Sequence, residues 1–354
     1  MSLAVEGRDL VAEGVHAGGE LHRLAPQWRA LVEQTRATPF QSAGWLLPWW
    51  RVFGSGDLCA VAVRDGRRLV ALAPLYVFRT AGGSREVRLI GTGNTDRLDV
   101  IAAPQIAAEA AQLVFRCLAD RDDWDAIELS MLPAGSPLLS AALPDGWRRE
   151  VTPCAVCPIV ALPSSVAAFE AALKPSLRHV LNNGRHRAAR LGVRWYTEAD
   201  RPPVDLLNAL IRLHEARWEE RGAPGVLHDP RVQAFHREAV EALALERRVR
   251  LTLMRLDGTD AAVFYGFTDG RTGYAYLGGF APEFGAIGAG TLVIGETIRR
   301  LIDEGVRTFD FLAGQEAYKY RWGAVDETLY RARITRHGTR GRPRTRSPRG
   351  LLVA

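Results

Sequence analysis

The sequence predicts a mixed α/β (α+β) fold in two halves, each a mixed, mainly antiparallel sheet with helices, joined by a helical segment. Two observations predict it: alternating apolar and polar runs separated by turn residues occur in both halves, and helical apolar spacing follows each group of runs. A chain of 354 residues also exceeds what one core usually organises. We expect domains at residues 1–160 and 161–335, followed by a basic disordered tail at 336–354.

The patterns are clearest in the second half. Residues 249–256 alternate as a strand, and Asp257-Gly258 supplies a turn to the next strand. Gly305 is placed to end the following helix. The predicted order is strands at 249–256, 261–268 and 272–280, a helix at 290–304, and strands at 307–312 and 329–335.

The first half repeats this order loosely. No residue identity links the halves, so the repeat is one of architecture alone. The predicted elements are strands at 58–64, 69–78 and 86–90, a helix at 104–119 and a strand at 124–130. Between the halves, helical spacing predicts helices at 166–189, 205–220 and 229–247.

The composition is typical of a globular chain, with 47% hydrophobic and 24% charged residues. No apolar run reaches the roughly 18 residues that a membrane span requires, and acidic residues interrupt the start, so we expect a cytoplasmic protein. The pair Cys154 and Cys157 has neither a second pair nor a nearby histidine, so we expect no metal site. Residues 328–354 hold eight arginines and no acid, and therefore account for the net charge of +6.

A glycine-rich turn precedes the predicted helix of the second half. Its sequence, Gly285-Ala-Ile-Gly-Ala-Gly-Thr291, places Gly288, Ala289, Gly290 and Thr291 at the helix start. Backbone N–H groups there can approach a ligand oxygen, and a helix N-terminus favours negative charge. These four residues are predicted to bind a pyrophosphate. The hairpins predicted before the helix argue against a dinucleotide-binding βαβ unit.

A second candidate segment, residues 310–323, surrounds Lys319. The chain contains only two lysines, Lys174 and Lys319, but 44 arginines. A lysine retained in such a sequence indicates a site that needs a compact ammonium. Acids and aromatic residues gather around Lys319 where a strand is predicted to end. We take this group as the catalytic candidates: Asp310, Glu316, Tyr318 and Lys319. A strand end with a solvated ion pair is the alternative.

The glycine turn resembles the pyrophosphate loop of GNAT-type N-acyltransferases, whose pattern begins with Gln or Arg where this chain has Gly285. The wider sequence resembles the cellulose-biosynthesis-type acetyltransferase family, which is GNAT-like and related in architecture to the Fem-type aminoacyl transferases with two GNAT-like halves. The motifs of this resemblance, between about 41 and 333, are Trp45…Pro48-Trp49-Trp50, Arg88-Leu-Ile-Gly-Thr-Gly93 with Asp96 and Asp99, the arginine-rich segment 176–192, and Asp310 to Gly323.

The resemblance implies transfer of an acyl group, acetyl in the first instance, from acetyl-CoA or another acyl-CoA to an amine of a small-molecule or carbohydrate-like acceptor. Asp310 or Glu316 would take a proton directly or through water, and Tyr318 would protonate the thiolate that leaves. Lys319 aligns with the lysine of the Fem-type Phe-Lys motif and would hold the oxyanion or the acyl carbonyl. No cysteine lies in the glycine turn or in the segment 310–323, so a covalent acyl-enzyme is not favoured.

Two further groups are candidates for binding the acceptor. Asp96 and Asp99, in a glycine-rich loop, would bind an amine, with turn formation as the alternative. Arg178 and Arg185 lie two helical turns apart and share a face that would clamp a phosphorylated acceptor or a tRNA backbone, with a solvated face as the alternative. The next helix would line the same region with His214, Arg217 and Trp218.

Two other functions stay open from the sequence. A Fem-like enzyme would take its acyl group from aminoacyl-tRNA, which the basic tail and the absence of Gln or Arg before Gly288 favour, whereas the glycine turn favours CoA. A non-catalytic GNAT-like binding module is the third hypothesis, against which the intact acid and lysine cluster argues.

Overall fold

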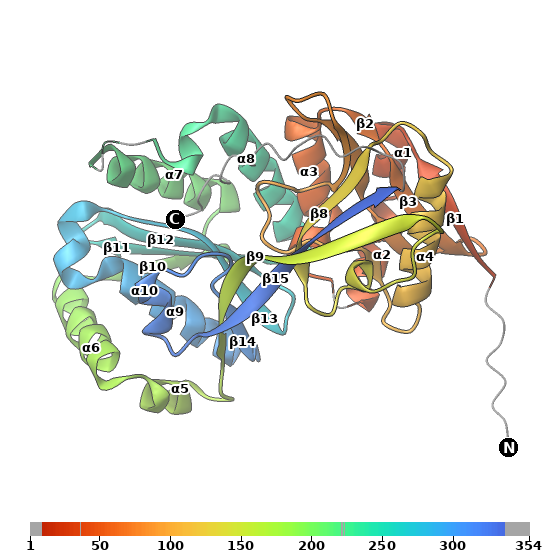
Figure 1. Cartoon of the computed structure of the whole chain (residues 1–354). Coiled ribbons are helices and arrows are strands. Elements are labelled where there is room, and N and C mark those ends of the chain that lie inside the picture. The colour runs from red at the N-terminus through yellow and green to blue at the C-terminus, as the bar shows by residue number, and fades with distance from the viewer. Residues whose placement is uncertain (1–8, 36, 221, 223, 337–354) are drawn as a thin grey trace, which may run out of the picture. The chain divides into compact units, whose positions relative to one another are not determined.

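The computed structural model describes residues 9–35, 37–220, 222 and 224–336 (Figure 1). Within them the chain forms two compact units, the first made of residues 9–155 and 328–336 and the second of residues 156–327. This confirms the mixed α/β fold in two halves. The tail predicted at 336–354 lies outside the described residues except for Arg336. Among the described helices, none is both long enough and apolar enough to cross a bilayer.

The first unit contains two groups of strands. Four antiparallel strands form one sheet in the order β1 (Leu10–Val15), β3 (Ala60–Asp65), β4 (Arg68–Ala73) and β7 (Ile101–Ala102). The other strands follow the order β15 (Val325–Arg336), β8 (Ala126–Pro133), β6 (Arg85–Leu89), β5 (Leu75–Arg79) and β2 (Asp57–Leu58), with β6 and β8 parallel.

The strand expected at 69–78 is two strands, because Pro74 interrupts it. Proline has no N–H for a ladder bond, so β4 ends at Ala73 and β5 begins at Leu75 in the other group. The carbonyl of Pro74 accepts a hydrogen bond from Ile90 N at 2.8 Å, which fixes the crossing point.

The helices of the first unit cover its sheets. The helix expected at 104–119 is present, and α3 buries Trp45 and Trp49 completely or nearly so. The helical segments are α1 (Gly18–Arg23), α2 (Ala25–Gln34), η1 (Pro39–Gln41), α3 (Ala43–Phe53), α4 (Ala107–Ala119) and η2 (Pro137–Leu139).

The second unit is built on one sheet that follows the order β10 (Arg194–Thr197), β11 (Val249–Leu256), β12 (Thr259–Thr268), β13 (Thr272–Phe280), β14 (Thr308–Asp310) and β9 (Trp147–Ala161). Neighbours are antiparallel except β13 and β14, which are parallel. The chain passes from the first unit to the second within β9 and returns within β15.

The last strand, expected at 329–335 as part of the C-terminal half, pairs in the first unit instead. Ala332 lies opposite Leu129, and Ile334 lies opposite Ile127. All four side chains are buried, so this strand completes the core of the first unit. Alternation in a sequence shows that a strand has a buried face, but it does not identify the partner strand.

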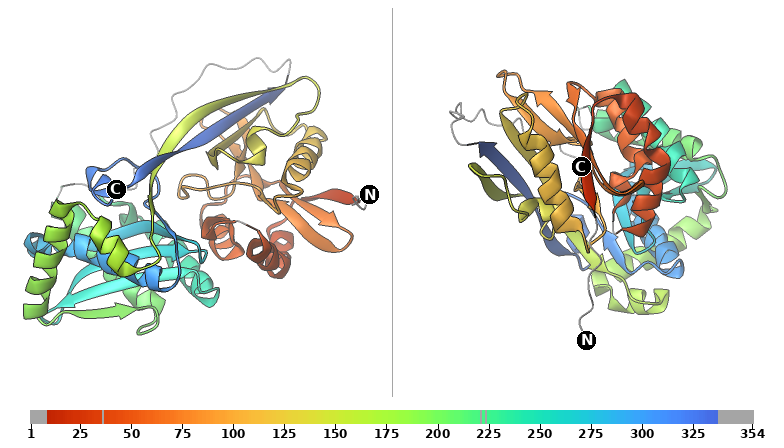
Figure 2. Two further views of the ribbon diagram at one scale, coloured as in Figure 1. Left: turned by 90° about the horizontal axis from the view of Figure 1, so that it is seen from below. Right: turned by 90° about the vertical axis from the view of Figure 1, so that its right-hand side faces the viewer.

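Helices lie on both faces of the sheet of the second unit (Figures 1 and 2). The expected helix at 166–189 is divided into α5 and α6, because Pro175 begins a new helix and disfavours helical backbone just before it. One face carries α5 (Val166–Ala172), α6 (Pro175–Arg190) and α9 (Ala289–Asp303), and the other carries α7 (Pro203–Glu220) and α8 (Pro230–Leu245). Shorter turns are η3 (Val226–His228), η4 (Pro282–Ile287) and α10 (Ala317–Tyr320).

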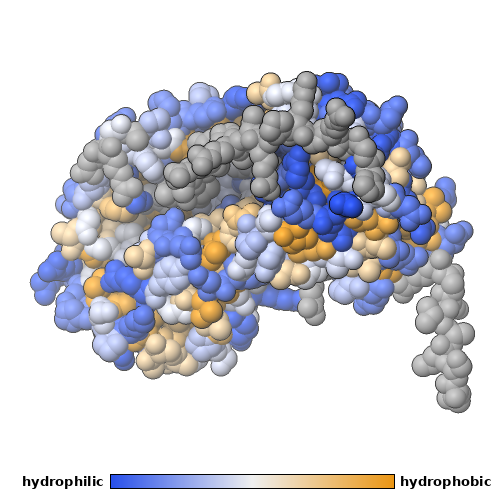
Figure 3. Space-filling view, viewed as in Figure 1, coloured by the Kyte–Doolittle hydropathy of each residue, from blue (hydrophilic) through white to orange (hydrophobic). Residues whose placement is uncertain are grey.

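Alternate residues of the central strands serve these two faces. Phe264 packs with the α5, α6 and α9 core, whereas Tyr265 packs against His236 of α8. On the molecular face shown in Figure 3, apolar residues are interspersed with polar ones, as on most protein surfaces.

Candidate active site

The predicted glycine turn leads directly into α9. Gly288 is the residue before the helix, with φ of +76°, and its N–H donates to Gly285 O at 2.9 Å. Glycine adopts this left-handed conformation without the strain that a Cβ would cause. The turn therefore delivers the chain into the helix with no side chain at the cap position.

The first amides of α9 are free within the described part of the chain. Leu292 N donates to Gly288 O at 2.9 Å, but Ala289, Gly290 and Thr291 have no such intrahelical partner and no other acceptor there. The ring of Phe280 lies close to Gly290, where an added Cβ would come within 3.1 Å of it. Three free N–H groups at the positive end of a 15-residue helix form an anion-binding arrangement.

Next to this helix start, β13 and β14 part from each other. They pair only through Thr272–Tyr274 and Thr308–Asp310, although β13 continues to Phe280 beside β12. Beyond Asp310 the chain follows β9 instead, since Phe311 N donates to Pro158 O at 2.9 Å. The last part of β13 is therefore unpaired along this edge among the described strands, and a ligand's own amides could bond to it.

The segment after β14 wraps around the ammonium of Lys319, which is only 3% exposed. Lys319 Nζ donates to the carbonyls of Leu312, Ala313 and Gly314 at 3.3, 2.9 and 3.1 Å. It also lies 2.8 Å from Glu316 Oε2. An ammonium has three N–H groups, and four acceptors already surround this one. In this arrangement Lys319 has no free donor for an oxyanion.

The backbone around Lys319 is bent to make these contacts. Leu312 has φ of +57° and Gly314 has φ of +112°, both in the left-handed region. Asp310, 1% exposed, accepts from Leu312 N through Oδ1 at 2.7 Å. Asp310 and Lys319 thus fix the two ends of the loop 310–316, and a strained non-glycine residue in such a loop is a feature of functional sites.

Tyr318 is the catalytic candidate with the most exposed surface, at 45%. Its ring packs edge-on against Phe311 with centroids 6.0 Å apart. Partial burial, followed by the negative charge of Glu316, raises the pKa of Tyr318 to about 12, while Arg217 opposes this shift. The phenol is therefore protonated at neutral pH and able to donate a hydrogen bond.

The three candidates on α7 do not act as one group. His214 Nε2 accepts from Trp218 Nε1 at 3.0 Å, and burial, followed by the charge of Arg217, lowers the pKa of His214 to about 4. His214 is therefore neutral at pH 7. Arg217 instead lies over the ring of Phe280, with its guanidinium carbon 4.9 Å from the ring centroid. The structure brings Arg217 to the end of β13 and the start of α9.

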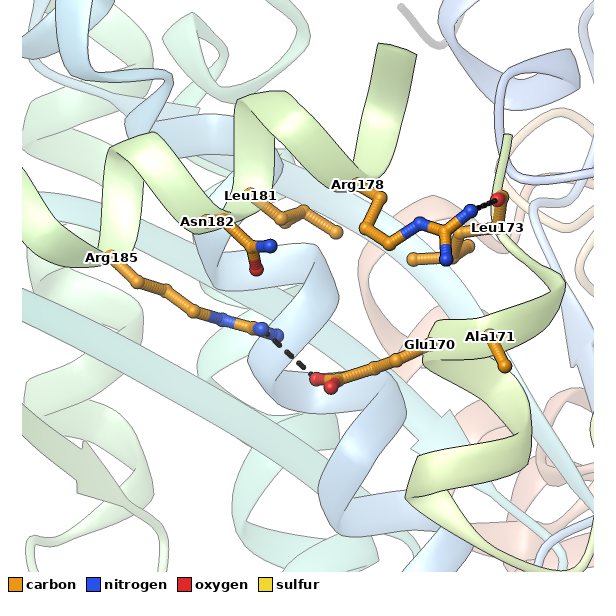
Figure 4. A pocket seen from close by; sticks show the side chains of 7 residues that line it. All are labelled: Glu170, Ala171, Leu173, Arg178, Leu181, Asn182 and Arg185. Carbon is orange, nitrogen blue, oxygen red and sulfur yellow. Dashed lines mark hydrogen bonds and ion pairs between the residues drawn. The ribbon is translucent and has the colours of Figure 1, made fainter. Parts of the chain in front are cut away.

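Arg178 and Arg185 share a face of α6, as predicted, but that face turns toward α5 (Figure 4). They line a cavity of about 170 Å³. Arg185 Nη1 lies 2.9 Å from Glu170 Oε1, and Arg178 Nη2 donates to Leu173 O at 3.4 Å. Both guanidinium groups are engaged within the helical layer, and the structure does not bring them to the start of α9.

Asp96 and Asp99 lie in the first unit, in a loop held by tryptophans. Trp45 Nε1 donates to Thr95 Oγ1 at 2.9 Å, and Trp49 Nε1 donates to Asn94 Oδ1 at 3.1 Å. Asp99 Oδ1 accepts from Ser136 Oγ at 2.7 Å, yet burial raises the pKa of Asp99 to about 7. The two tryptophan hydrogen bonds tie the loop to α3, and the carboxyl groups of Asp96 and Asp99 are largely enclosed.

Sequence reasoning missed Phe280. It counted Arg187 among the arginines of the segment 176–192, whose basic face would clamp a phosphorylated ligand, but it did not place Arg187 beside the glycine turn. Phe280 connects Arg217 to Gly290, and Arg187 Nη1 donates to Ala286 O in the glycine turn at 3.1 Å. The helical spacing of Arg187 from Gly184 was a signal that Arg187 lies at a packed face of the helix, because a glycine within a helix often marks close packing.

Comparison with protein families identifies the part of the chain that carries this site. Residues 175–320 match the family described as an acetyltransferase (GNAT) domain. The second unit carries a GNAT acyltransferase domain. The match spans the glycine turn, the parting strands and the loop around Lys319. The finer resemblance to the cellulose-biosynthesis-type family stays a prediction.

Solved structures resemble the chain over most of its length. FemX is similar with a TM-score of 0.62, 11% identity and coverage of 90% of this chain and 96% of that one. The C-terminal domain of a putative lysylphosphatidylglycerol synthetase from Agrobacterium fabrum gives 0.55, 14% identity and coverage of 88% and 91%. At such identities the similarity describes the fold alone. No curated protein sequence gives a match.

Proposed function

We propose that this protein transfers an acyl group, acetyl in the first instance, from a CoA thioester to an amine of a small-molecule or carbohydrate-like acceptor. The observation that carries the proposal is the set of free amides at Ala289–Thr291 beside the parting of β13 and β14. Amides at a helix start suit the diphosphate of CoA, and the unpaired edge of β13 suits the amides of its pantetheine arm. The GNAT match over the same residues supports this assignment.

The proposed reaction uses the loop around Lys319. A neutral amine attacks the thioester carbonyl, and the resulting tetrahedral intermediate expels the CoA thiolate as the C–S bond breaks. Tyr318 gives its proton to the thiolate, and a carboxylate takes the proton that the amine loses, directly or through water. We assign that carboxylate to Glu316, since its side chain is 30% exposed, whereas Asp310 is buried and holds the loop. The Tyr318 phenolate is reprotonated from solvent.

Lys319 has a positioning role in this proposal. Its four acceptors hold the loop that presents Tyr318 and Glu316. Charge on the tetrahedral oxygen would be stabilised by backbone N–H groups, which act in many acyltransfer sites. Asp96 and Asp99 are retained as candidates for binding the acceptor amine.

Acyl-CoA binding and consumption test the function. The purified protein is incubated with acetyl-CoA and longer acyl-CoAs, together with a panel of amino sugars, amino acids and polyamines, and free thiol is measured. We expect one donor to be bound and to release CoA in the presence of an amine. Tyr318→Phe should slow thiol release without weakening donor binding. A wild-type protein that neither binds nor consumes any acyl-CoA would contradict the proposal.

Aminoacyl-tRNA is the alternative donor, and the arginines of α6 are the observation that favours it, since Arg187 and Arg190 are exposed. Charged tRNA in the same assay separates the two donors. Binding that weakens steeply with salt, together with aminoacyl transfer, would replace CoA by tRNA. Binding of a donor or acceptor with no turnover for any pair would indicate a binding module.

A further inference from the structure

A second face of α6 contacts the glycine turn before α9. Val180, Gly184 and Arg187 lie four and three residues apart and therefore share one side of the helix. An added Cβ at Gly184 would come within 2.7 Å of Ile287 O, and one at Gly288 would lie 3.7 Å from Val180 Cγ1. The absence of a side chain at Gly184 therefore allows α6 to approach the turn closely.

Arg187 extends from this face to the turn itself. Its Nη1 donates to Ala286 O at 3.1 Å, and this is its one hydrogen-bond partner among the residues that the structure describes. A guanidinium has five N–H donors in a planar fork, so most of them are available to a ligand. The contact with Ala286 places them two residues before Gly288, close to the free amides of α9.

The two groups suit one kind of ligand. The amides of Ala289–Thr291 offer donors for one phosphate, and the Arg187 fork offers a charged pair of donors for phosphate oxygens beside it. Gly285, at the start of this sequence motif, has no side chain that could supply such a charge. Arg178 and Arg185 are engaged on the opposite face with Leu173 O and Glu170. Glu283 is exposed in η4, two residues before Gly285, and its negative charge opposes anion binding there.

We propose that Arg187 holds the diphosphate of the acyl donor together with the amides of Ala289–Thr291. The inference rests on the proposed CoA donor and adds the side chain that recognises its phosphates. Arg187 thereby contributes from α6 the positive charge that the glycine turn itself lacks.

Calorimetric titration with CoA and with dephospho-CoA, which keeps the diphosphate but lacks the 3′-phosphate, tests this inference. We expect Arg187→Ala to weaken both ligands by about ten-fold or more, as for loss of a charge-assisted hydrogen bond. Arg187→Lys should lose about three-fold, since it keeps the charge but not the planar fork. Arg116→Ala removes an exposed arginine on α4 in the first unit and should match the wild type, which controls for net charge.

Each other outcome has a defined meaning. If Arg187→Ala binds CoA like the wild type, Arg187 does not contact the donor and the inference is overturned while the proposed function stands. If the loss appears with CoA but not with dephospho-CoA, Arg187 recognises the 3′-phosphate and the diphosphate assignment is overturned. If the wild type binds neither ligand, the CoA donor itself is overturned and the inference with it. Unchanged melting of Arg187→Ala confirms that the variant is folded.

Discussion

A single buried ammonium organises the candidate catalytic loop. Three carbonyls and the Glu316 carboxylate lie within 3.3 Å of Lys319 Nζ, and the residue is 3% exposed. We expect Lys319→Met to cost about 3–5 kcal/mol of stability, because it leaves a carboxylate and three carbonyls without their cation. Lys319→Arg keeps the charge but brings a larger, planar group into a filled space, so it should lower both the melting temperature and kcat.

The CoA affinity of the Lys319 variants distinguishes a positioning role of Lys319 from a role in binding the donor. The free amides of α9 bind the donor in our proposal, so CoA affinity in Lys319→Arg should stay within about two-fold of the wild type while kcat falls. The double variant Lys319→Met with Glu316→Gln should recover part of the stability, since no carboxylate in the loop then lacks its cation. Near-normal stability and turnover in Lys319→Arg would show instead that only the charge matters.

At the scale of elements, sequence periodicity predicted correctly those strands whose bounds depend on neighbouring residues alone. The strands at 249–256 and 272–280 are present with the expected bounds, because Asp-Gly turns and alternation act within a few residues. The single strand expected at 69–78 was wrong at Pro74, whose missing N–H divides it. Which face of a helix meets which neighbour depends on packing. The sequence therefore placed Arg178 and Arg185 on one face but did not reveal that Arg187 contacts the glycine turn.

Substitution of Gly288, the residue before α9, tests whether this helix start binds the donor. Gly288→Ala places a Cβ on a residue with φ of +76°, which should cost about 1 kcal/mol of stability and tilt the first turn of the helix. Gly258→Ala is a matched control, because Gly258 has φ of +73° and open space around it in the β11–β12 turn. Both variants should lose similar stability, but only Gly288→Ala should weaken CoA binding in a titration. Equal CoA affinity in the two variants would contradict a donor site at this helix.

At the scale of the whole molecule, the two units carry buried titratable groups with opposite consequences. In the second unit, burial lowers the pKa of His236 to about 3 and that of His214 to about 4, so both are neutral in the folded state. In the first unit, burial raises the pKa of Asp99 to about 7, so it is protonated below that pH. Neither charge state follows from the sequence, since burial, which the sequence does not show, is the largest cause of these shifts.

The stability of the units should therefore respond to pH in opposite directions. Between pH 6.5 and the folded pKa values, the histidines bind protons in the unfolded state but stay neutral in the folded state. The second unit therefore loses stability as pH falls, by about 2 kcal/mol at pH 5 for His236 alone. Between pH 3.8 and about 7, folded Asp99 keeps a proton that the unfolded state releases, so the first unit loses stability as pH rises.

Hydrogen exchange, corrected for intrinsic rates, can follow each unit separately. At pH 5 the protection of α8 should fall relative to pH 8, and the protection of residues 91–100 should rise. His236→Phe should abolish the first effect, and Asp99→Asn, which retains acceptors for Ser136 and Val100, should abolish the second. If both units lose protection at the same end of the pH range, or if the variants behave like the wild type, burial of these groups does not control the stability of the units.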